Sequence, residues 1–235
     1  MIRAILFDKD GTLTDFRATW DGWMPAMIRD LSRASGHPEQ GVADAFGFDL
    51  GAGRLRDDAL IVTAPGHVTV AAAARAIGWS ARDLSAWIGP RSSSVRQVMV
   101  PGVPQVVARL VAAGLPLGVL TNASEAEARN HLTDMGIVDH ITRIIGHDSG
   151  FGAKPDPRGA ADFARALGLP PASVALVGDG LTDMAAARGA GLTAVAVLTG
   201  TLGRAALAPH AAAVIDDVTG LPDWLAMADR ESRAT

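Results

Sequence analysis

Two carboxylates stand two residues apart at the end of an apolar run near the N-terminus. The run covers residues 2–7, and Asp8 and Asp10 follow it directly, with Gly11 closing the turn. Carboxylates at the exit of a buried strand can hold a divalent cation, and one of them can attack an electrophile. An Asp-x-Asp pair alone is common in turns, but the appended Gly-Thr and the strand in front make a chance match rare. If residues 2–7 form a working strand, we expect no removable targeting peptide ahead of it.

Three later polar clusters also follow predicted strands. They are Thr121-Asn122, Lys154-Pro155 and the segment from Asp179 to Asp183. Each cluster alone fits turn or helix-cap chemistry, and a lone loop lysine is usually solvated. In open α/β sheets, ligands bind beyond the carboxyl ends of the strands. Because all four clusters arrive in order, each after a strand, they predict one shared site.

The elements that must position this site alternate between strands and helices. Strands are expected at residues 2–7, 115–121, 142–146, 173–178, 193–198 and 212–215, and helices at 103–113, 124–135, 156–167, 182–188 and 220–228. Ser124 and Glu127 have capping-box spacing, and Asp156-Pro157 is a typical helix start. This order predicts an α/β fold with a doubly wound parallel, Rossmann-like sheet.

Residues 16–98 differ in character from the rest and are expected to form an inserted all-α cap domain. They hold four of the five tryptophans. Apolar residues at helical spacing begin at Trp23, shorter helices are expected at 68–77 and 82–88, and a turn or loop at 51–56. The α/β core is therefore expected to comprise residues 1–15 and 99–228. Residues 229–235 are expected to be a flexible tail.

The composition excludes several classes of function. The net charge is −4 and the pI about 5.8, so no broad basic surface indicates nucleic acid or anionic lipid as a partner. With no cysteine, disulfides, thiolate metal sites and a cysteine nucleophile are impossible. Gly, Pro or charge interrupts every apolar stretch before the roughly 18 residues that a membrane span needs. We therefore expect a soluble, cytoplasmic protein; the sequence does not distinguish a monomer from a homodimer.

The chemistry that suits these clusters is phosphoryl transfer. A phosphate monoester is dianionic, so an anionic nucleophile needs cations and amide donors to approach it. A hard cation with oxygen ligands, most simply Mg²⁺, is expected on Asp8, Asp179 and Asp10, the last through its backbone carbonyl. Lys154 would supply a point positive charge to the nucleophile and the phosphate.

The remaining polar groups would bind the phosphate oxygens. Thr121, Asn122 and the backbone amides around Asp10 and Gly11 are the expected donors, together with Lys154. Arg54 and Arg56, in the inserted segment, could meet a substrate carboxylate, although surface arginines are the simpler interpretation.

The four clusters resemble the four motifs of the haloacid dehalogenase-like hydrolase superfamily. The matching stretches are Phe7-Asp8-x-Asp10-Gly11-Thr12-Leu13, Thr121-Asn122, Lys154-Pro155 and Gly178-Asp179-x-x-x-Asp183. The insertion resembles the helical cap that this superfamily places between its first and second motifs. Within the superfamily, Pro101-Gly102 and Gly146-His147-Asp148-Ser149 are most similar to phosphoglycolate phosphatase-like enzymes.

The resemblance implies a role for each acid. Asp8 would be the nucleophile and form an aspartyl-phosphate, and Asp10 would protonate the leaving alcohol and then activate water. Asp179 would bind the metal, while Asp183 would orient Asp179, a metal-bound water or Lys154. Lys9 stands where relatives often have an apolar residue, and its backbone could serve equally well.

These inferences predict a Mg²⁺-dependent phosphomonoester hydrolase of a small metabolite, with 2-phosphoglycolate as the first substrate to test. Sugar phosphates, nucleoside monophosphates and pyrophosphate are alternative substrates. A phosphomutase of the same superfamily and a catalytically idle binding module are the alternatives of other classes.

Overall fold

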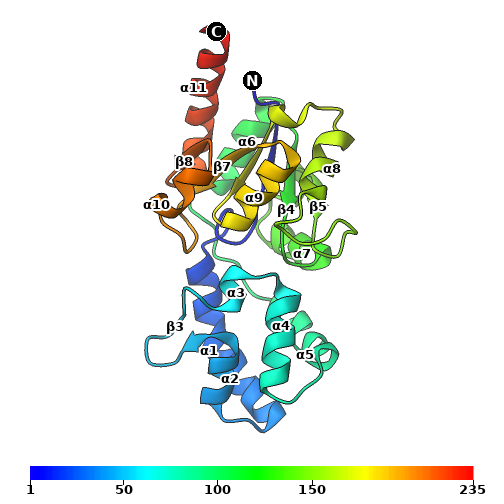
Figure 1. Cartoon of the computed structure of the whole chain (residues 1–235), viewed down its shortest axis with the longest axis vertical. Helices are drawn as coiled ribbons and strands as arrows, with labels where there is room; N and C mark the ends of the chain where they lie inside the picture. The colour runs from blue at the N-terminus through cyan, green and yellow to red at the C-terminus, as the bar shows by residue number, and fades with distance from the viewer. Residues whose placement is uncertain (235) are drawn as a thin grey trace. The chain divides into compact units, whose positions relative to one another are not determined.

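The computed structural model describes residues 1–234 and divides into two compact units (Figure 1). The first unit comprises Met1–Asp15 and the chain from Gln97 onward. The second unit, Phe16–Arg96, is inserted between these two parts. Among the helices of residues 1–234, none combines the length and the apolar character that crossing a bilayer requires.

The first unit is built on a six-stranded parallel sheet with the strand order β5-β4-β1-β6-β7-β8. Its strands are β1 (Ala4–Phe7), β4 (Leu117–Leu120), β5 (Ile141–Ile145), β6 (Val174–Gly178), β7 (Thr193–Val197) and β8 (Ala213–Ile215). Phe7 in β1 pairs with Val119 on one side and with Val177 on the other. The chain order reverses at β1 and β6, and such a switch point opens a crevice beyond the strand ends. The predicted fold class is confirmed.

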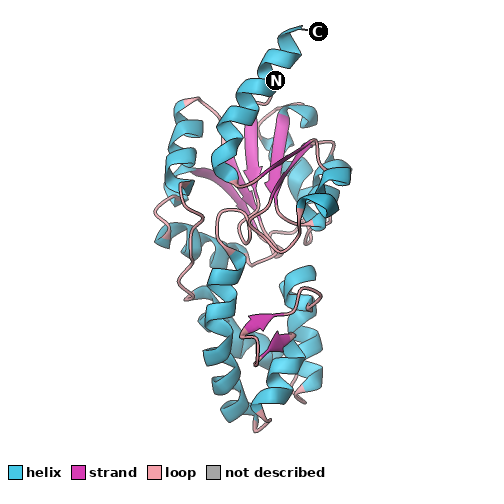
Figure 2. Cartoon of the chain, turned by 90° about the vertical axis from the view of Figure 1, so that its left-hand side faces the viewer, coloured by secondary structure: helices cyan, strands magenta, loops and turns pink. Residues whose placement is uncertain are grey.

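Helices cover both faces of the sheet (Figure 2). One face packs against α6 (Val103–Ala112), α7 (Glu125–Asp134) and α11 (Leu221–Ala234), and the other against α8 (Arg158–Ala166), α9 (Leu181–Ala190) and α10 (Arg204–Leu207). Side chains alternate along β1, so Ile5 and Phe7 enter the first core and Ala4 and Leu6 the second. Both cores are apolar, which explains why this strand reads as a continuous hydrophobic run.

Short 3₁₀ helices complete the first unit. They are η1 (Val138–His140), η2 (Pro171–Ser173), η3 (Ala208–His210) and η4 (Val218–Gly220). The Ser124 hydroxyl accepts a hydrogen bond from the Glu127 amide at 3.2 Å, as its spacing predicts. Helix α8 begins two residues later than expected, and the Asp156 carboxylate before it accepts a bond from the Arg158 amide at 3.0 Å. The segment expected to be a flexible tail is helical as far as Ala234, and Thr235 lies outside the described residues.

The second unit has a core of its own. Its helices are α1 (Phe16–Ser35), α2 (Glu39–Phe46), α3 (Leu60–Thr63), α4 (Gly66–Ala76) and α5 (Ala81–Ser93). A short antiparallel hairpin of β2 (Phe48–Asp49) and β3 (Arg54–Leu55) stands where the sequence predicts only a turn. The hairpin adds a small β element to the helical insertion, and Leu55 is buried in the core between the helices.

Candidate active site

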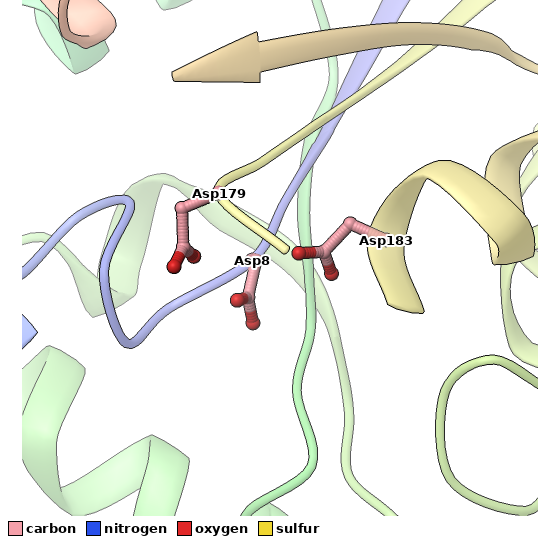
Figure 3. A group of neighbouring side chains, drawn as sticks. All are labelled: Asp8, Asp179 and Asp183. Atoms are coloured by element: carbon pink, nitrogen blue, oxygen red, sulfur yellow. The ribbon is translucent and has the colours of Figure 1, made fainter. Parts of the chain in front are cut away.

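Three carboxylates converge at the switch point of the sheet. Asp8 follows β1, Asp179 follows the neighbouring strand β6, and Asp183 lies in the first turn of α9. Figure 3 shows the three side chains turned toward one another from these separate elements. One oxygen from each lies within 4.8 Å of the others. Strand pairing between β1 and β6 therefore brings together acids that are far apart in the sequence.

Lys154 balances two of these carboxylates. Its ammonium nitrogen lies 2.5 Å from Asp8 Oδ1 and donates a hydrogen bond to Asp183 Oδ1 at 2.7 Å. Burial alone would lower the pKa of this ammonium, but the charges of Asp183 and Asp8 together outweigh it and raise the pKa above its ordinary value of 10.5. Lys154 therefore stays protonated. The contact with Asp183 corresponds to one of the roles expected for that residue.

Burial shifts the acids in the opposite sense. Asp8 is buried, and burial raises its pKa from 3.8 to about 7. The positive charge of Lys154 lowers this pKa, and the negative charge of Asp183 raises it further. Burial also raises the pKa of Asp179 well above its ordinary value, helped by the charges of Asp8 and Asp183. A group of carboxylates in this state favours a bound cation, because the cation would stabilise their charged forms.

The charges and ligand atoms of this group fit a hard divalent cation. With all groups ionised, the three carboxylates and one ammonium carry a net charge of −2, which one divalent cation would balance. Carboxylate oxygens are the ligands that Mg²⁺ prefers. Asp8 and Asp179 can offer them, whereas Asp183 is already committed to Lys154 and to the Gly180 amide, from which its Oδ2 accepts a bond at 2.9 Å.

Asn122 acts on Lys154 from the end of β4. Its carboxamide oxygen accepts a hydrogen bond from the Lys154 amide at 2.8 Å, and its Nδ2 donates to the Lys154 carbonyl at 3.2 Å. The expected phosphate donor therefore fixes the lysine loop in this structure. The neighbouring Thr121 hydroxyl is buried and accepts a bond from the Ala123 amide at 3.2 Å. That bond uses an oxygen lone pair, so the Thr121 O–H can still donate to a ligand.

Gly11 and Thr12 support the site in ways the sequence does not reveal. The Gly11 amide, expected to face phosphate, donates within its own turn to the Thr14 carbonyl at 2.8 Å. At φ +80°, Gly11 also packs against Asp179 so closely that a Cβ atom would overlap the carboxylate. The Thr12 hydroxyl donates to Asp179 Oδ1 at 3.2 Å. These residues hold Asp179 in place.

Asp10 stands apart from the three-carboxylate group. Within residues 1–234, the group of close metal-ligating side chains does not include Asp10. Its carboxylate forms an ion pair with Lys9, whose ammonium lies 2.7 Å from each of the two oxygens. The side chain of Lys9 thus has a partner in the site, whereas the sequence indicated a role for its backbone alone.

Two further residues reach the site from β7. The Thr199 hydroxyl donates to the Gly11 carbonyl at 2.6 Å, and Gly200 packs directly on Asp179. Sequence reasoning missed both, although Thr199-Gly200 follows the strand predicted at residues 193–198 as the four recognised clusters follow theirs. The polar residue and glycine at that strand end were the available signal.

Arg54 and Arg56 lie in the second unit. Arg54 forms an exposed ion pair with Asp57 at 3.4 Å, and Arg56 one with Asp44 at 3.9 Å. Both arginines line a pocket of about 360 Å³, together with Asp49, Leu55, Asp57 and Asp58. With three acids beside two arginines, the pocket itself has no excess of positive charge.

The fold and the site together define a doubly wound α/β protein with an acidic, lysine-balanced centre at the strand ends. A family model of haloacid dehalogenase-like hydrolases matches residues 2–191. The chain belongs to this family, which confirms the resemblance drawn from the four motifs.

Individual relatives cover almost the whole chain. The phosphoglycolate phosphatase of Rhodospirillum rubrum is 30% identical over 225 residues, covering 96% of this chain and 91% of that protein. The N-acetylmuramic acid 6-phosphate phosphatase of Pseudomonas putida is 30% identical over 211 residues, covering 85% and 84%. A crystal structure described as a predicted phosphoglycolate phosphatase from Haemophilus somnus has a TM-score of 0.72 and 19% identity, covering 95% of this chain and 98% of that one. That structural likeness shows the shared fold.

Proposed function

We propose that the chain is a Mg²⁺-dependent phosphomonoester hydrolase that acts on a small phosphorylated metabolite through an aspartyl-phosphate at Asp8. The observation that carries the proposal is the Lys154 ammonium held between Asp8 and Asp183. A carboxylate can attack a dianionic phosphate only if positive charge lies beside it, because the two anions otherwise repel. Lys154 supplies that charge at 2.5 Å from the attacking group.

Two displacements at phosphorus complete the proposed reaction. In the first, an oxygen of Asp8 attacks phosphorus, the bond to the leaving oxygen breaks, and Asp10 gives that oxygen a proton. In the second, the Asp10 carboxylate takes a proton from water, the water oxygen attacks phosphorus, and the bond to Asp8 breaks. Phosphate leaves and both acids return to their starting states. Thr121 and Lys154 bind the phosphate oxygens through both steps.

Asp8, Asp179 and the backbone carbonyl of Asp10 would hold Mg²⁺. The ion would neutralise charge on the phosphate and the nucleophile. Asp183 remains with Lys154, and Thr12, Gly11 and Gly200 keep the Asp179 carboxylate where it can serve as a ligand.

The relatives support 2-phosphoglycolate as the first substrate to test. A second candidate is a sugar phosphate, favoured by the similarity to N-acetylmuramic acid 6-phosphate phosphatase. Both named compounds are phosphate esters of carboxylic acids, so a carboxylate on the substrate is a shared feature. In the proposal, Arg54 and Arg56 select for this carboxylate by exchanging their ion pairs with Asp57 and Asp44 for it. Their replacement by alanine should then raise KM for 2-phosphoglycolate but leave KM for p-nitrophenyl phosphate, which has no carboxylate, unchanged.

A phosphate-release screen tests the proposal directly. The panel should contain 2-phosphoglycolate, sugar phosphates including N-acetylmuramate 6-phosphate, nucleoside monophosphates and pyrophosphate, each with Mg²⁺ and with chelator. We expect Mg²⁺-stimulated release that the variant Asp8→Asn lacks. Steady release without a bisphosphate activator would exclude a phosphomutase. If no compound of the panel releases phosphate, or if Asp8→Asn is fully active, the proposal is overturned.

A trapped complex tests the nucleophile independently of the substrate. Beryllium fluoride with Mg²⁺ mimics a phosphoryl group attached to a carboxylate, so we expect it on an oxygen of Asp8. A crystal structure with the fluoride on another residue would remove Asp8 from the proposed mechanism.

A further inference from the structure

Lys9 is a fully buried lysine between the two acids of the first motif. Its exposed fraction is 0%, and its ammonium lies 2.7 Å from both oxygens of Asp10. Lysine is almost never fully buried without a partner, because removing an ammonium from water is costly. The Asp10 carboxylate is therefore the group that makes burial of this ammonium possible.

Lysine is rare in this chain, and Lys9 is one of only two. Of the 21 basic residues, only two are lysines, Lys9 and Lys154; all the others are arginines. Both lysines are buried, and each contacts one of the acids proposed to do chemistry, Lys154 with Asp8 and Lys9 with Asp10. An ammonium is a compact point charge, whereas a guanidinium is a wide planar fork. The chain keeps lysine at the two positions where a small cation must fit beside a reacting carboxylate.

The contact restricts how the Asp10 carboxylate can turn. The Lys9 carbonyl accepts bonds from the amides of Leu13 at 2.9 Å and Thr14 at 3.1 Å, so main-chain bonds close the turn that begins at Lys9. Because the ammonium contacts both carboxylate oxygens, rotation of the Asp10 side chain would lose at least one contact. The Asp10 side chain is 22% exposed, so water can also reach it.

We propose that Lys9 is the positioning residue for Asp10: it fixes the carboxyl group that gives a proton to the leaving oxygen and, as a carboxylate, later takes one from water. This inference rests on the proposed phosphatase reaction. No bond to Lys9 forms or breaks in either step. General acid–base groups contribute roughly 10²–10⁴-fold to rates, so a misplaced Asp10 should cost a measurable part of that factor.

The kinetic test uses Lys9→Met, which keeps the length of the buried stem, with Asp10→Asn and the double variant. The probes are phenyl phosphate and p-nitrophenyl phosphate, which differ in how much their leaving oxygen needs a proton. For Lys9→Met we expect kcat for phenyl phosphate to fall about tenfold or more, with KM nearly unchanged and a smaller fall for p-nitrophenyl phosphate. In the Asp10→Asn background, removing Lys9 should cause no further loss.

Additive losses in the double variant would overturn the proposal, because a structural role of Lys9 does not depend on Asp10. An unchanged kcat for phenyl phosphate in Lys9→Met would overturn it as well. In either case a wild-type enzyme that still needs Asp8 for turnover leaves the proposed function standing. An inactive wild-type enzyme, or an active Asp8→Asn variant, overturns the proposed function and with it this inference.

Nuclear magnetic resonance of isotope-labelled lysine gives a readout without turnover. With only two lysines, the folded protein should show two ammonium signals, and Lys9→Met assigns them. Asp10→Asn should shift the Lys9 signal strongly and leave the Lys154 signal nearly in place. If Lys9→Met does not fold, selective labelling with Asp10→Asn alone decides the case. If the Lys9 ammonium signal keeps its chemical shift in Asp10→Asn, the proposal is overturned.

Discussion

Gly200 packs against Asp179 so tightly that a Cβ atom at position 200 would overlap the carboxylate. The two residues follow neighbouring strands, β7 and β6, and their contact is a consequence of the parallel pairing of these strands. Side-chain volume at position 200 therefore controls where a proposed metal ligand can lie.

Gly200→Ala should displace Asp179 and weaken metal binding without unfolding the protein. Outer groups that orient a metal ligand typically affect metal affinity or activity by about 10–100-fold, and we expect the Mg²⁺ concentration for half-maximal activity to rise within that range. Gly203→Ala is the matched control, because its Cβ would meet nothing within 4 Å. Metal titrations of both variants check the prediction. Equal Mg²⁺ requirements in the two would show that the contact does not matter.

Lys154→Met should remove the charge that balances Asp8 and Asp183. By analogy with the loss of one donor from an oxyanion site, we expect kcat to fall about 10²–10³-fold, equivalent to ~2.7–4 kcal/mol of transition-state stabilisation. Lys154→Arg keeps the charge but adds a planar group to a buried position with contacts of 2.5 and 2.7 Å, so it should restore little activity. Steady-state measurements of kcat for both variants check this prediction. A fall of less than tenfold in Lys154→Met would show that the Lys154 charge contributes little to the reaction.

Stability of the metal-free protein should fall as the pH rises through about 7. The folded-state pKa of Asp8 is raised from 3.8 to about 7, chiefly by burial, so the folded protein holds this proton more tightly than the unfolded chain. The resulting stabilisation is complete below the unfolded pKa of 3.8 and is lost through the folded pKa of about 7. The raised pKa of Asp179 acts in the same direction, while Lys154 titrates above this range.

Denaturant titrations in chelator check this sign. From about pH 5 to about pH 8 we expect the free energy of unfolding to drop by roughly a few kcal/mol, and by less in Asp8→Asn. Mg²⁺ should restore stability mainly at the higher pH, because it stabilises the ionised carboxylates. A metal-free protein that gains stability over this range relative to Asp8→Asn would contradict the prediction.

The sequence alone predicts those parts of the site that depend on local signals. Asp8, Thr121 and Asp179 each follow an apolar strand, and the parallel pairing of these strands makes their ends adjacent. Thr199 and Gly200 also follow a predicted strand, yet a single Thr-Gly pair does not indicate chemistry. Their role depends on the tertiary contacts with Gly11 and Asp179.

Side-chain direction was the part that sequence could not supply. Lys9 turns its ammonium to Asp10 because the tight turn at residues 9–14 places neighbouring side chains together. Helix α2 was missed for a different reason: Pro38 begins it without any side-chain cap bond, and only Gly47 in the left-handed conformation marks its end. Local capping rules thus miss a helix whose stability comes mainly from packing.

Asn122 provides the last prediction, because it holds the loop of a residue 32 positions away. Asn122→Ala removes two hydrogen bonds to the Lys154 main chain, each worth about 1 kcal/mol, so stability should fall by about 1–2 kcal/mol. The rate should fall as well, since the loop no longer fixes the Lys154 ammonium beside Asp8.

Thr142→Val is the matched control for Asn122→Ala. It removes a side-chain bond to the Leu117 carbonyl of 2.8 Å at the amino end of β4, the end of the sheet opposite the site. We expect a comparable or smaller loss of stability with kcat unchanged. Denaturant titration and steady-state kinetics of both variants separate the two effects. If kcat falls equally in both, the Asn122 bonds act only through stability. If it falls in Asn122→Ala alone, they position the Lys154 ammonium for its proposed role.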